Sequence, residues 1–146
     1  MGYLALLRTN RNFRLLWIAQ VISEIGDWFY TVAIYSLLLE YTGSAKSIAL
    51  AFTLQVLPQF ICSPSAGVIN DRLSRRRVML FADFSRAIIV SGMLFIRGPE
   101  AVNFLYALLF LETIMWALFE PGRTATIPNI TSGPDVITGN TLSSIT

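Results

Sequence analysis

The sequence predicts an all-α integral membrane protein with four transmembrane helices and the start of a fifth. Three observations support this fold class: 54% of the residues are hydrophobic, only 14% are charged, and the charges gather between long apolar runs. Soluble domains carry about 25% charged residues, so this chain has too few charges to cover a surface that faces water. The apolar runs are therefore predicted to cross a membrane, and the charged stretches to connect them.

The lengths of the apolar runs fit helices that cross a bilayer. Such a helix needs about 20 residues to cross a hydrocarbon core of ~30 Å. The segments that satisfy this length are residues 13–39, 47–67, 78–96 and 101–119. Their short connections make consecutive helices antiparallel neighbours. Residues 1–146 are thus predicted to form one N-terminal transmembrane bundle, with a fifth span truncated after about residue 136.

Lysine and arginine are unevenly distributed between the two sides of this predicted bundle. Positively charged loops are retained on the cytoplasmic side of a membrane. Eight basic residues lie before the first span, between the second and third, or after the fourth, whereas the opposite side has only Lys46 and Arg97. The N-terminus and the loop over residues 68–77 are therefore predicted to be cytoplasmic.

The sequence lacks the residues that common catalytic and cofactor sites require. It contains no histidine and a single cysteine, Cys62, within an apolar run. Zinc sites and histidine-centred catalysis are therefore not expected, and there is no phosphate-binding loop or dinucleotide fingerprint. The net charge of +2 is small, and no basic patch with interleaved aromatic residues points to nucleic acid. We predict no enzymatic activity, no cofactor, no metal site and no nucleic-acid partner.

Four polar residues form a stripe along the first predicted span: Gln20, Glu24, Asp27 and Thr31. Their spacing places them on one face of a helix. An aspartate near the centre of a bilayer costs about 2.5–3.5 kcal/mol on insertion scales, so the stripe is predicted to face inward. Two interpretations remain open. Either Glu24 or Asp27 binds a proton or a cationic substrate, or the two carboxylates make structural contacts to a neighbouring helix, for example to Arg86.

Charged residues also occur within the third and fourth predicted spans. Asp83 and Arg86 are three residues apart, which allows them to pair within one helix. The alternative is that Arg86 pairs with the carboxylates of the first span. Glu112 lies within the fourth span. Together with the stripe, these three residues are the predicted proton and substrate pathway.

Prolines are expected to bend or break two of the spans. Pro58 and Pro64 lie in the second span and are predicted as kinks. The Pro121-Gly122 pair predicts a broken end of the fourth helix, because a proline frees backbone groups that are tolerated only near water or protein. Arg123 then follows as a cation at the cytoplasmic end.

The segment between the second and third spans carries a glycine, an acid and arginines in a distinctive order: Gly67, Asp71, Arg72, Arg75 and Arg76. Membrane anchoring by positive charge explains the arginines, but neither the glycine at the helix exit nor the acid before the basic run. Glycine permits close approach of two helices. An aspartate here is placed to accept hydrogen bonds at a helix N-terminus or to pair with an arginine.

This segment resembles the signature of the major facilitator superfamily, Gly-x-x-x-Asp-Arg/Lys-x-Gly-Arg/Lys-Arg/Lys, which follows the second span of those transporters. Ser74 stands where the second glycine is usual. In the family this loop latches the two six-helix halves together on the cytoplasmic side and releases them during alternating access. The resemblance implies a gating role for Gly67, Asp71, Arg72, Arg75, Arg76 and Arg123.

Further segments resemble the branch that contains macrolide-efflux proteins and the enterobactin exporter. They lie at residues 12–17, 23–27, 71–80, 83–86 and 120–128. The resemblance implies the N-terminal part of a twelve-helix transporter in a bacterial plasma (inner) membrane. It also implies proton-coupled efflux of a drug-like or siderophore-like molecule, with membrane lipid, substrate, proton and the missing C-terminal helices as partners. The alternative from a different class is a small four-helix membrane scaffold without transport activity.

Overall fold

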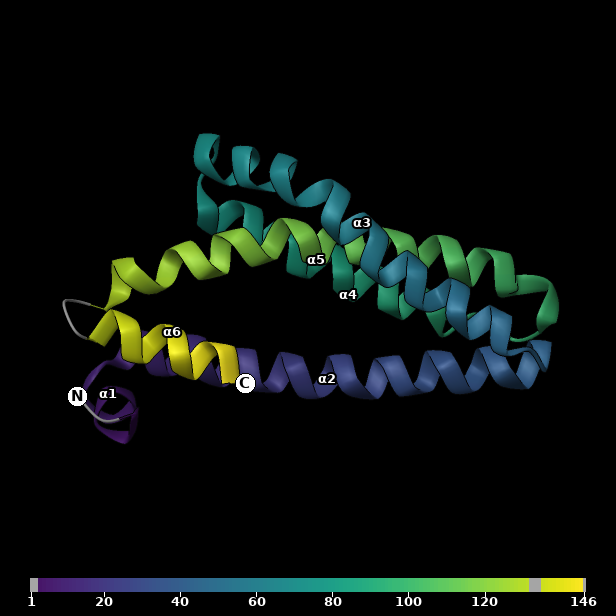
Figure 1. The fold of residues 1–146 in the computed structure, drawn as a ribbon, viewed down its shortest axis with the longest axis horizontal. Helices are drawn as coiled ribbons and strands as arrows, with labels where there is room; N and C mark the ends of the chain where they lie inside the picture. Colours follow the sequence, from purple (N-terminus) through teal and green to yellow (C-terminus); the bar gives the residue numbers. More distant parts are fainter. Residues whose placement is uncertain (1–2, 132–134, 146) are drawn as a thin grey trace. The chain divides into compact units, whose positions relative to one another are not determined.

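The computed structural model describes residues 3–131 and 135–145, and the regular structure within these ranges is entirely helical (Figure 1). In chain order the helices are α1 (Tyr3–Thr9), α2 (Arg11–Thr42), α3 (Ala45–Arg72), α4 (Arg75–Met93), the 3-10 helix η1 (Pro99–Ala101), α5 (Val102–Ile130) and α6 (Asp135–Ile145). Helices α2 to α5 occupy the segments predicted as spans, and α6 lies where a fifth span is expected to begin. The all-helical prediction is confirmed.

Among the described residues, two helical stretches are long and apolar enough to cross a membrane by length and composition: Ala45–Arg72 and Pro99–Ile130. The sequence predicts four spans. Helix α2 has the required length, at 32 residues, but Glu24 and Asp27 interrupt its apolar sequence. Helix α4 has 19 residues and begins with three consecutive arginines. Charged residues therefore distinguish α2 and α4 from an ordinary apolar span.

The connection between α3 and α4 is shorter than the loop predicted over residues 68–77. Helix α3 continues to Arg72 and α4 begins at Arg75, so only residues 73–74 lie between them. Residues 68–77 contain neither glycine nor proline, the residues that most disfavour helix, and arginine itself favours helix. The positive charge of this stretch is therefore compatible with helical structure. Asp71 consequently lies in the last turn of α3, at a helix C-terminus, whereas the sequence predicts either a place at a helix N-terminus or pairing with an arginine.

Helix α5 passes through the position where it is predicted to break. It continues over Pro121 and Pro128 to Ile130, beyond the predicted end at residue 119. A proline removes one N–H donor, yet a helix continues when neighbouring groups satisfy the freed carbonyl. Helix α3 contains Pro58 and Pro64 in the same way. Helix α1 is not predicted by the sequence analysis, because its seven residues are too few for a span.

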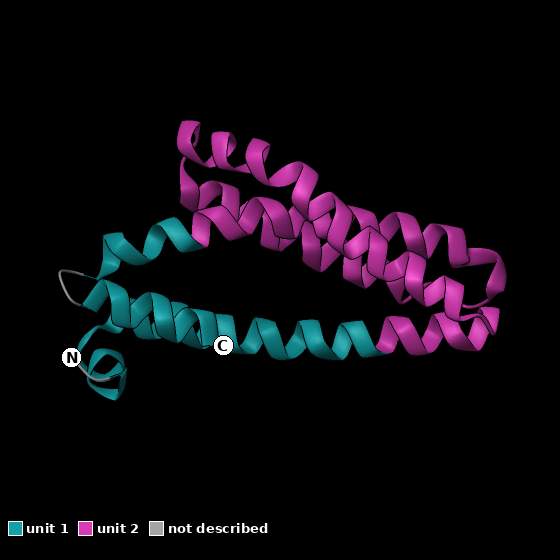
Figure 2. Ribbon diagram, viewed as in Figure 1, with its two compact units in different colours: residues 1–32, 124–146 teal, residues 33–123 magenta. Residues whose placement is uncertain are grey.

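The chain divides into two compact units (Figure 2). Unit 1 consists of residues 1–32 and 124–146, and unit 2 of residues 33–123. In unit 1, Phe13 and Ile127 are each 1% exposed and form the centre of an apolar cluster. Gly139 of α6 packs closely here, since a Cβ atom added to it would lie 3.1 Å from the Phe13 ring and 3.2 Å from Ile127.

Within unit 2, α5 packs beside α3. The Tyr106 hydroxyl donates a hydrogen bond to the carbonyl of Ser47 (3.2 Å), and the Asn70 side-chain amide donates to the carbonyl of Leu118 (2.9 Å). Because the early residues of α3 meet the early residues of α5, and the late residues meet the late ones, these two helices run parallel. The short connection at residues 73–74 makes α4 antiparallel to α3.

Large apolar side chains remain exposed in both units. Trp28 and Phe29 of α2 are 70% and 74% exposed, and Phe60 of α3 and Phe84 of α4 are 75% and 70% exposed. Soluble monomers rarely expose contiguous apolar surface on this scale, whereas lipid or further protein covers it in a membrane. The surface of both units thus favours a membrane environment.

Candidate functional site

The polar stripe of α2 lies on the less exposed face of that helix. Gln20 is 8% exposed, and Glu24, Asp27 and Thr31 are half-buried. Trp28, between them in sequence, is 70% exposed. A surface helix of a soluble protein shows the opposite arrangement, with its polar face in water. The polar face of α2 is therefore its less exposed face, and the apolar face is the more exposed one.

Gln20 is held by α6, the helix that the sequence shows only as the start of a fifth span. Its side-chain Nε2 donates to the main-chain carbonyl of Ser143 (2.7 Å), and the Ser143 hydroxyl donates to Gln20 Oε1 (2.7 Å). Both residues are buried, at 8% and 7% exposure. This reciprocal pair gives Gln20 a packing role that its place in the stripe does not reveal.

We expect Ser143→Ala to weaken the attachment of α6 within unit 1. The substitution removes a hydroxyl donor from buried Gln20 Oε1, which costs about 1–3 kcal/mol. Ser144→Ala is the matched control, because Ser144 is exposed and its hydroxyl bonds the carbonyl of Asn140 in its own helix. The thermal unfolding midpoint of the purified full-length protein measures the difference. Equal midpoints for the two variants would contradict the assigned role.

Arg86 of α4 and Glu112 of α5 form an ion pair in unit 2. Arg86 Nε lies 2.8 Å from Glu112 Oε1, and the two side chains are 11% and 8% exposed. Charges at this depth are tolerated because they are paired and hydrogen-bonded. The sequence marks Glu112 as an acid inside an apolar run, but does not identify its partner. The pairing of Asp83 with Arg86 within α4 stays a prediction.

Asn70, which is absent from the predicted site, joins α3 to α5 beside the arginine-rich hairpin. Its Nδ2 donates to the carbonyls of Leu118 (2.9 Å) and Ala66 (3.0 Å), and the residue is 3% exposed. Gly122 of α5 lies against the same amide, since a Cβ atom added there would lie 2.7 Å from Asn70 Oδ1 and 2.9 Å from Met79 Cγ. A larger residue at position 122 would therefore displace the side chain of Asn70 or Met79.

Five of the six residues assigned to gating lie in the α3–α4 hairpin, and three of these five are exposed. Asp71, Arg72 and Arg76 are exposed, and Arg75 is half-buried. Within residues 3–131 and 135–145, no hydrogen bond or ion pair reaches the Asp71 carboxylate. A Cβ atom added at Gly67 would meet nothing within 4 Å, so the described part of the chain does not make the close helix approach expected at this glycine.

Arg123, the last of the predicted gating residues, is bound within its own helix. Its Nε lies 2.9 Å from Glu120 Oε2, and its Nη2 lies 2.5 Å from Glu120 Oε1. The two side chains are 13% and 28% exposed. Since α5 continues through Pro121, the spacing of three residues brings the two charges together on one helical face.

Comparison of the sequence with known proteins identifies the family of this chain. Residues 2–146 match the family described as transmembrane secretion effector. An uncharacterized transporter of the major facilitator type from Bacillus subtilis (strain 168) is 25% identical over 126 residues, which cover 86% of this chain and 30% of the relative. Macrolide efflux protein A of Streptococcus pyogenes is 29% identical over 121 residues, covering 80% of this chain and 29% of the relative.

A further relative, a multidrug efflux pump of Mycolicibacterium fortuitum, is 31% identical over 115 residues, covering 76% of this chain and 28% of the pump. The chain thus spans about 30% of the length of the curated relatives it matches. No solved structure is significantly similar to it. The family match over nearly the whole sequence confirms the resemblance found at the arginine-rich hairpin. The chain belongs to the transmembrane secretion effector family of the major facilitator superfamily.

Proposed function

We propose that this chain is part of a secondary active transporter that exports a small drug-like or siderophore-like molecule from a bacterium in exchange for protons. Helices α2 to α5 span the plasma (inner) membrane, with the N-terminus and the α3–α4 hairpin in the cytoplasm. The partners are membrane lipid, the substrate, the proton and the remaining helices of the same transporter. Transport proceeds by alternating access, in which two bundles rock about a site near the middle of the membrane.

The main support for this proposal is the distribution of polar and apolar residues around α2. Glu24 and Asp27 lie on its less exposed face, while Trp28 and Phe29 are largely exposed. In a bilayer, lipid covers the apolar face, and a carboxylate on the opposite face needs a cavity or a partner. Ionisable residues within a membrane segment commonly mark a substrate or proton pathway. We therefore assign proton or substrate binding to Glu24 and Asp27.

The lengths of α2 and α4 support four spans despite their charges. The 32 residues of α2 correspond to about 48 Å of helix, and the 19 residues of α4 to about 28 Å. A hydrocarbon core of ~30 Å is covered by the first, and the part of α4 that follows its three arginines (19 minus 3, or 16 residues) covers about 24 Å of it. The three arginines that open α4 then lie in the headgroup region, and its remaining cation, Arg86, is neutralised by Glu112.

The exposed α3–α4 hairpin is the proposed latch. Asp71 finds no partner among the described residues, and the face beside Gly67 is open. Both features fit a surface that meets the other half of the transporter, where the Asp71 carboxylate would find hydrogen-bond donors and Gly67 would allow close approach. The relatives named for macrolide and multidrug efflux favour export over uptake.

Accumulation of labelled drug tests the proposed activity. Cells that express the complete gene are expected to retain less of a labelled macrolide, or of another drug in a small panel, than cells without it. A protonophore should abolish the difference, because it removes the driving force. A panel of cationic and neutral compounds that accumulate equally with and without the gene would argue against drug export.

We expect Glu24→Gln or Asp27→Asn to abolish proton-driven export while the protein still reaches the membrane. Each substitution removes the group that would take up the proton but keeps the size of the side chain. Glu40→Gln is the matched control, since Glu40 is an exposed carboxylate near the end of the same helix. Export into inverted vesicles with an imposed pH gradient measures the effect. Normal export by both the Glu24 and the Asp27 variant would remove the carboxylates from the mechanism.

A further inference from the structure

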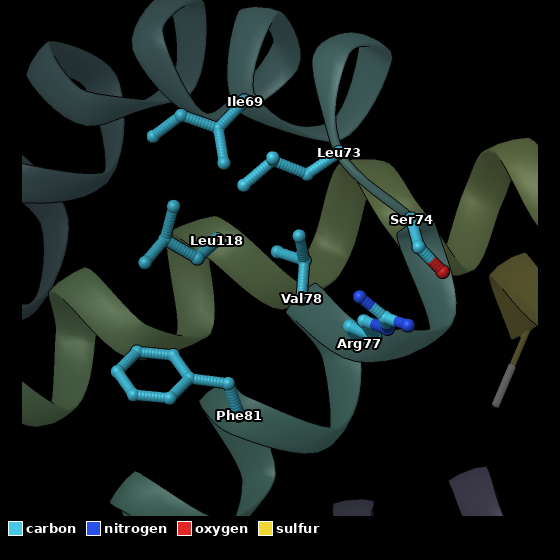
Figure 3. A pocket seen from close by; sticks show the side chains of 7 residues that line it. All are labelled: Ile69, Leu73, Ser74, Arg77, Val78, Phe81 and Leu118. Atoms are coloured by element: carbon cyan, nitrogen blue, oxygen red, sulfur yellow. The ribbon is translucent and has the colours of Figure 1, made fainter.

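A pocket of about 410 Å³ lies at the α3–α4 hairpin in unit 2 (Figure 3). Five apolar side chains line most of it: Ile69, Leu73, Val78, Phe81 and Leu118. The only polar side chains that line it, Ser74 and Arg77, lie together at one edge (Figure 3). The pocket therefore offers a hydrocarbon surface with a cation and a hydroxyl at its rim.

The charge around this rim is strongly positive. Residues 71–77 contain four arginines and one aspartate, so the hairpin carries a net charge of +3 (four minus one). Arg77 is exposed, and its guanidinium makes no hydrogen bond or ion pair within the ranges 3–131 and 135–145. A guanidinium with open donors suits a phosphate group, which it can contact through two parallel hydrogen bonds.

We propose that this pocket binds one anionic phospholipid. Its phosphate contacts Arg77 and Ser74, and the first part of an acyl chain lies along Val78, Phe81 and Leu118. The apolar lining favours a lipid over a free phosphate ester, and the charge of the hairpin favours an anionic over a zwitterionic headgroup. The proposal rests on the proposed topology in one respect, that the hairpin lies at the membrane surface.

Lipid retention measured by native mass spectrometry tests this site directly. The full-length protein is purified in detergent and titrated with phosphatidylglycerol or with phosphatidylcholine of the same acyl chains. We expect one phosphatidylglycerol to be retained in preference to phosphatidylcholine. Arg77→Gln should lower this retention roughly tenfold, as the loss of a charge-assisted hydrogen bond predicts. Arg97→Gln, which removes the same charge from an exposed residue outside the pocket, should leave it unchanged.

Four results would overturn the proposal. Equal retention of the two lipids would show no headgroup selectivity, and equal losses in the Arg77 and Arg97 variants would show a diffuse charge effect. Competition by soluble glycerol phosphate as strong as that by the lipid would identify a site for a free phosphate ester. Because the measurement requires no transport, absent lipid binding with intact export would reject this site alone. Absent export with intact lipid binding would reject only the proposed function.

Discussion

Replacing Glu112 with leucine is expected to destabilise unit 2 by about 3–5 kcal/mol. The substitution removes the carboxylate that lies 2.8 Å from Arg86 and leaves a guanidinium at 11% exposure without that counter-charge. The double variant Arg86→Met/Glu112→Leu should recover most of the loss, since replacing a buried ion pair by apolar residues is often neutral. Unfolding of the full-length protein in detergent measures all three proteins.

The same unfolding measurement, made on the variants Asp83→Asn and Glu112→Gln, tests the pairing that the sequence predicts within α4. Asp83 is exposed, whereas Glu112 is 6% exposed. If Glu112 is the main partner of Arg86, Asp83→Asn should cost well under half as much as Glu112→Gln. An equal or larger loss on changing Asp83 would show that the intrahelical pair dominates, and that the contact between α4 and α5 contributes little.

Gly122→Ala is expected to disrupt the joint between α3, α4 and α5. The added methyl group would lie 2.7 Å from Asn70 Oδ1 and 2.9 Å from Met79 Cγ, so the amide and its hydrogen bond to the Leu118 carbonyl must shift. Overpacking of this kind costs typically about 1–3 kcal/mol. The unfolding midpoint should fall, and the α3–α4 hairpin should become more accessible to protease.

Gly67→Ala is the matched control for this substitution. Both glycines are helical, but a Cβ atom at Gly67 meets nothing within 4 Å. Alanine is favoured over glycine in a helix by about 1 kcal/mol, so Gly67→Ala should leave stability unchanged or raise it slightly. If Gly67 serves the latch, export should still fall in this variant. Equal destabilisation by the two alanines would contradict the close approach assigned to Gly122.

The most successful predictions concern features that depend only on residues close together in the sequence. The positions of α2 to α5 follow from long apolar runs, because helix formation and hydropathy are local properties. Family membership follows from the ordered residues of the Gly67–Arg76 segment. The connection between α3 and α4 covers fewer residues than the stretch 68–77 also for a local reason, because the arginines of this stretch favour helix.

The prolines show a different limit of sequence reasoning. Pro121 predicts the end of a helix, but α5 continues past it to Ile130. Whether a helix ends at a proline depends on whether the freed carbonyl finds a donor or a favourable surrounding elsewhere. The residues adjacent to a proline do not by themselves specify that surrounding.

The sequence by itself determined a helical chain with long apolar segments, polar groups within them and the signature of its superfamily. Only the tertiary structure decided which of those polar groups meet: Arg86 with Glu112, Asn70 with the Leu118 carbonyl, and Gln20 with Ser143. These partners are 26, 48 and 123 residues apart. Helical periodicity fixes the face on which a side chain lies, but the partner depends on which helix packs against that face, and no local pattern specifies it.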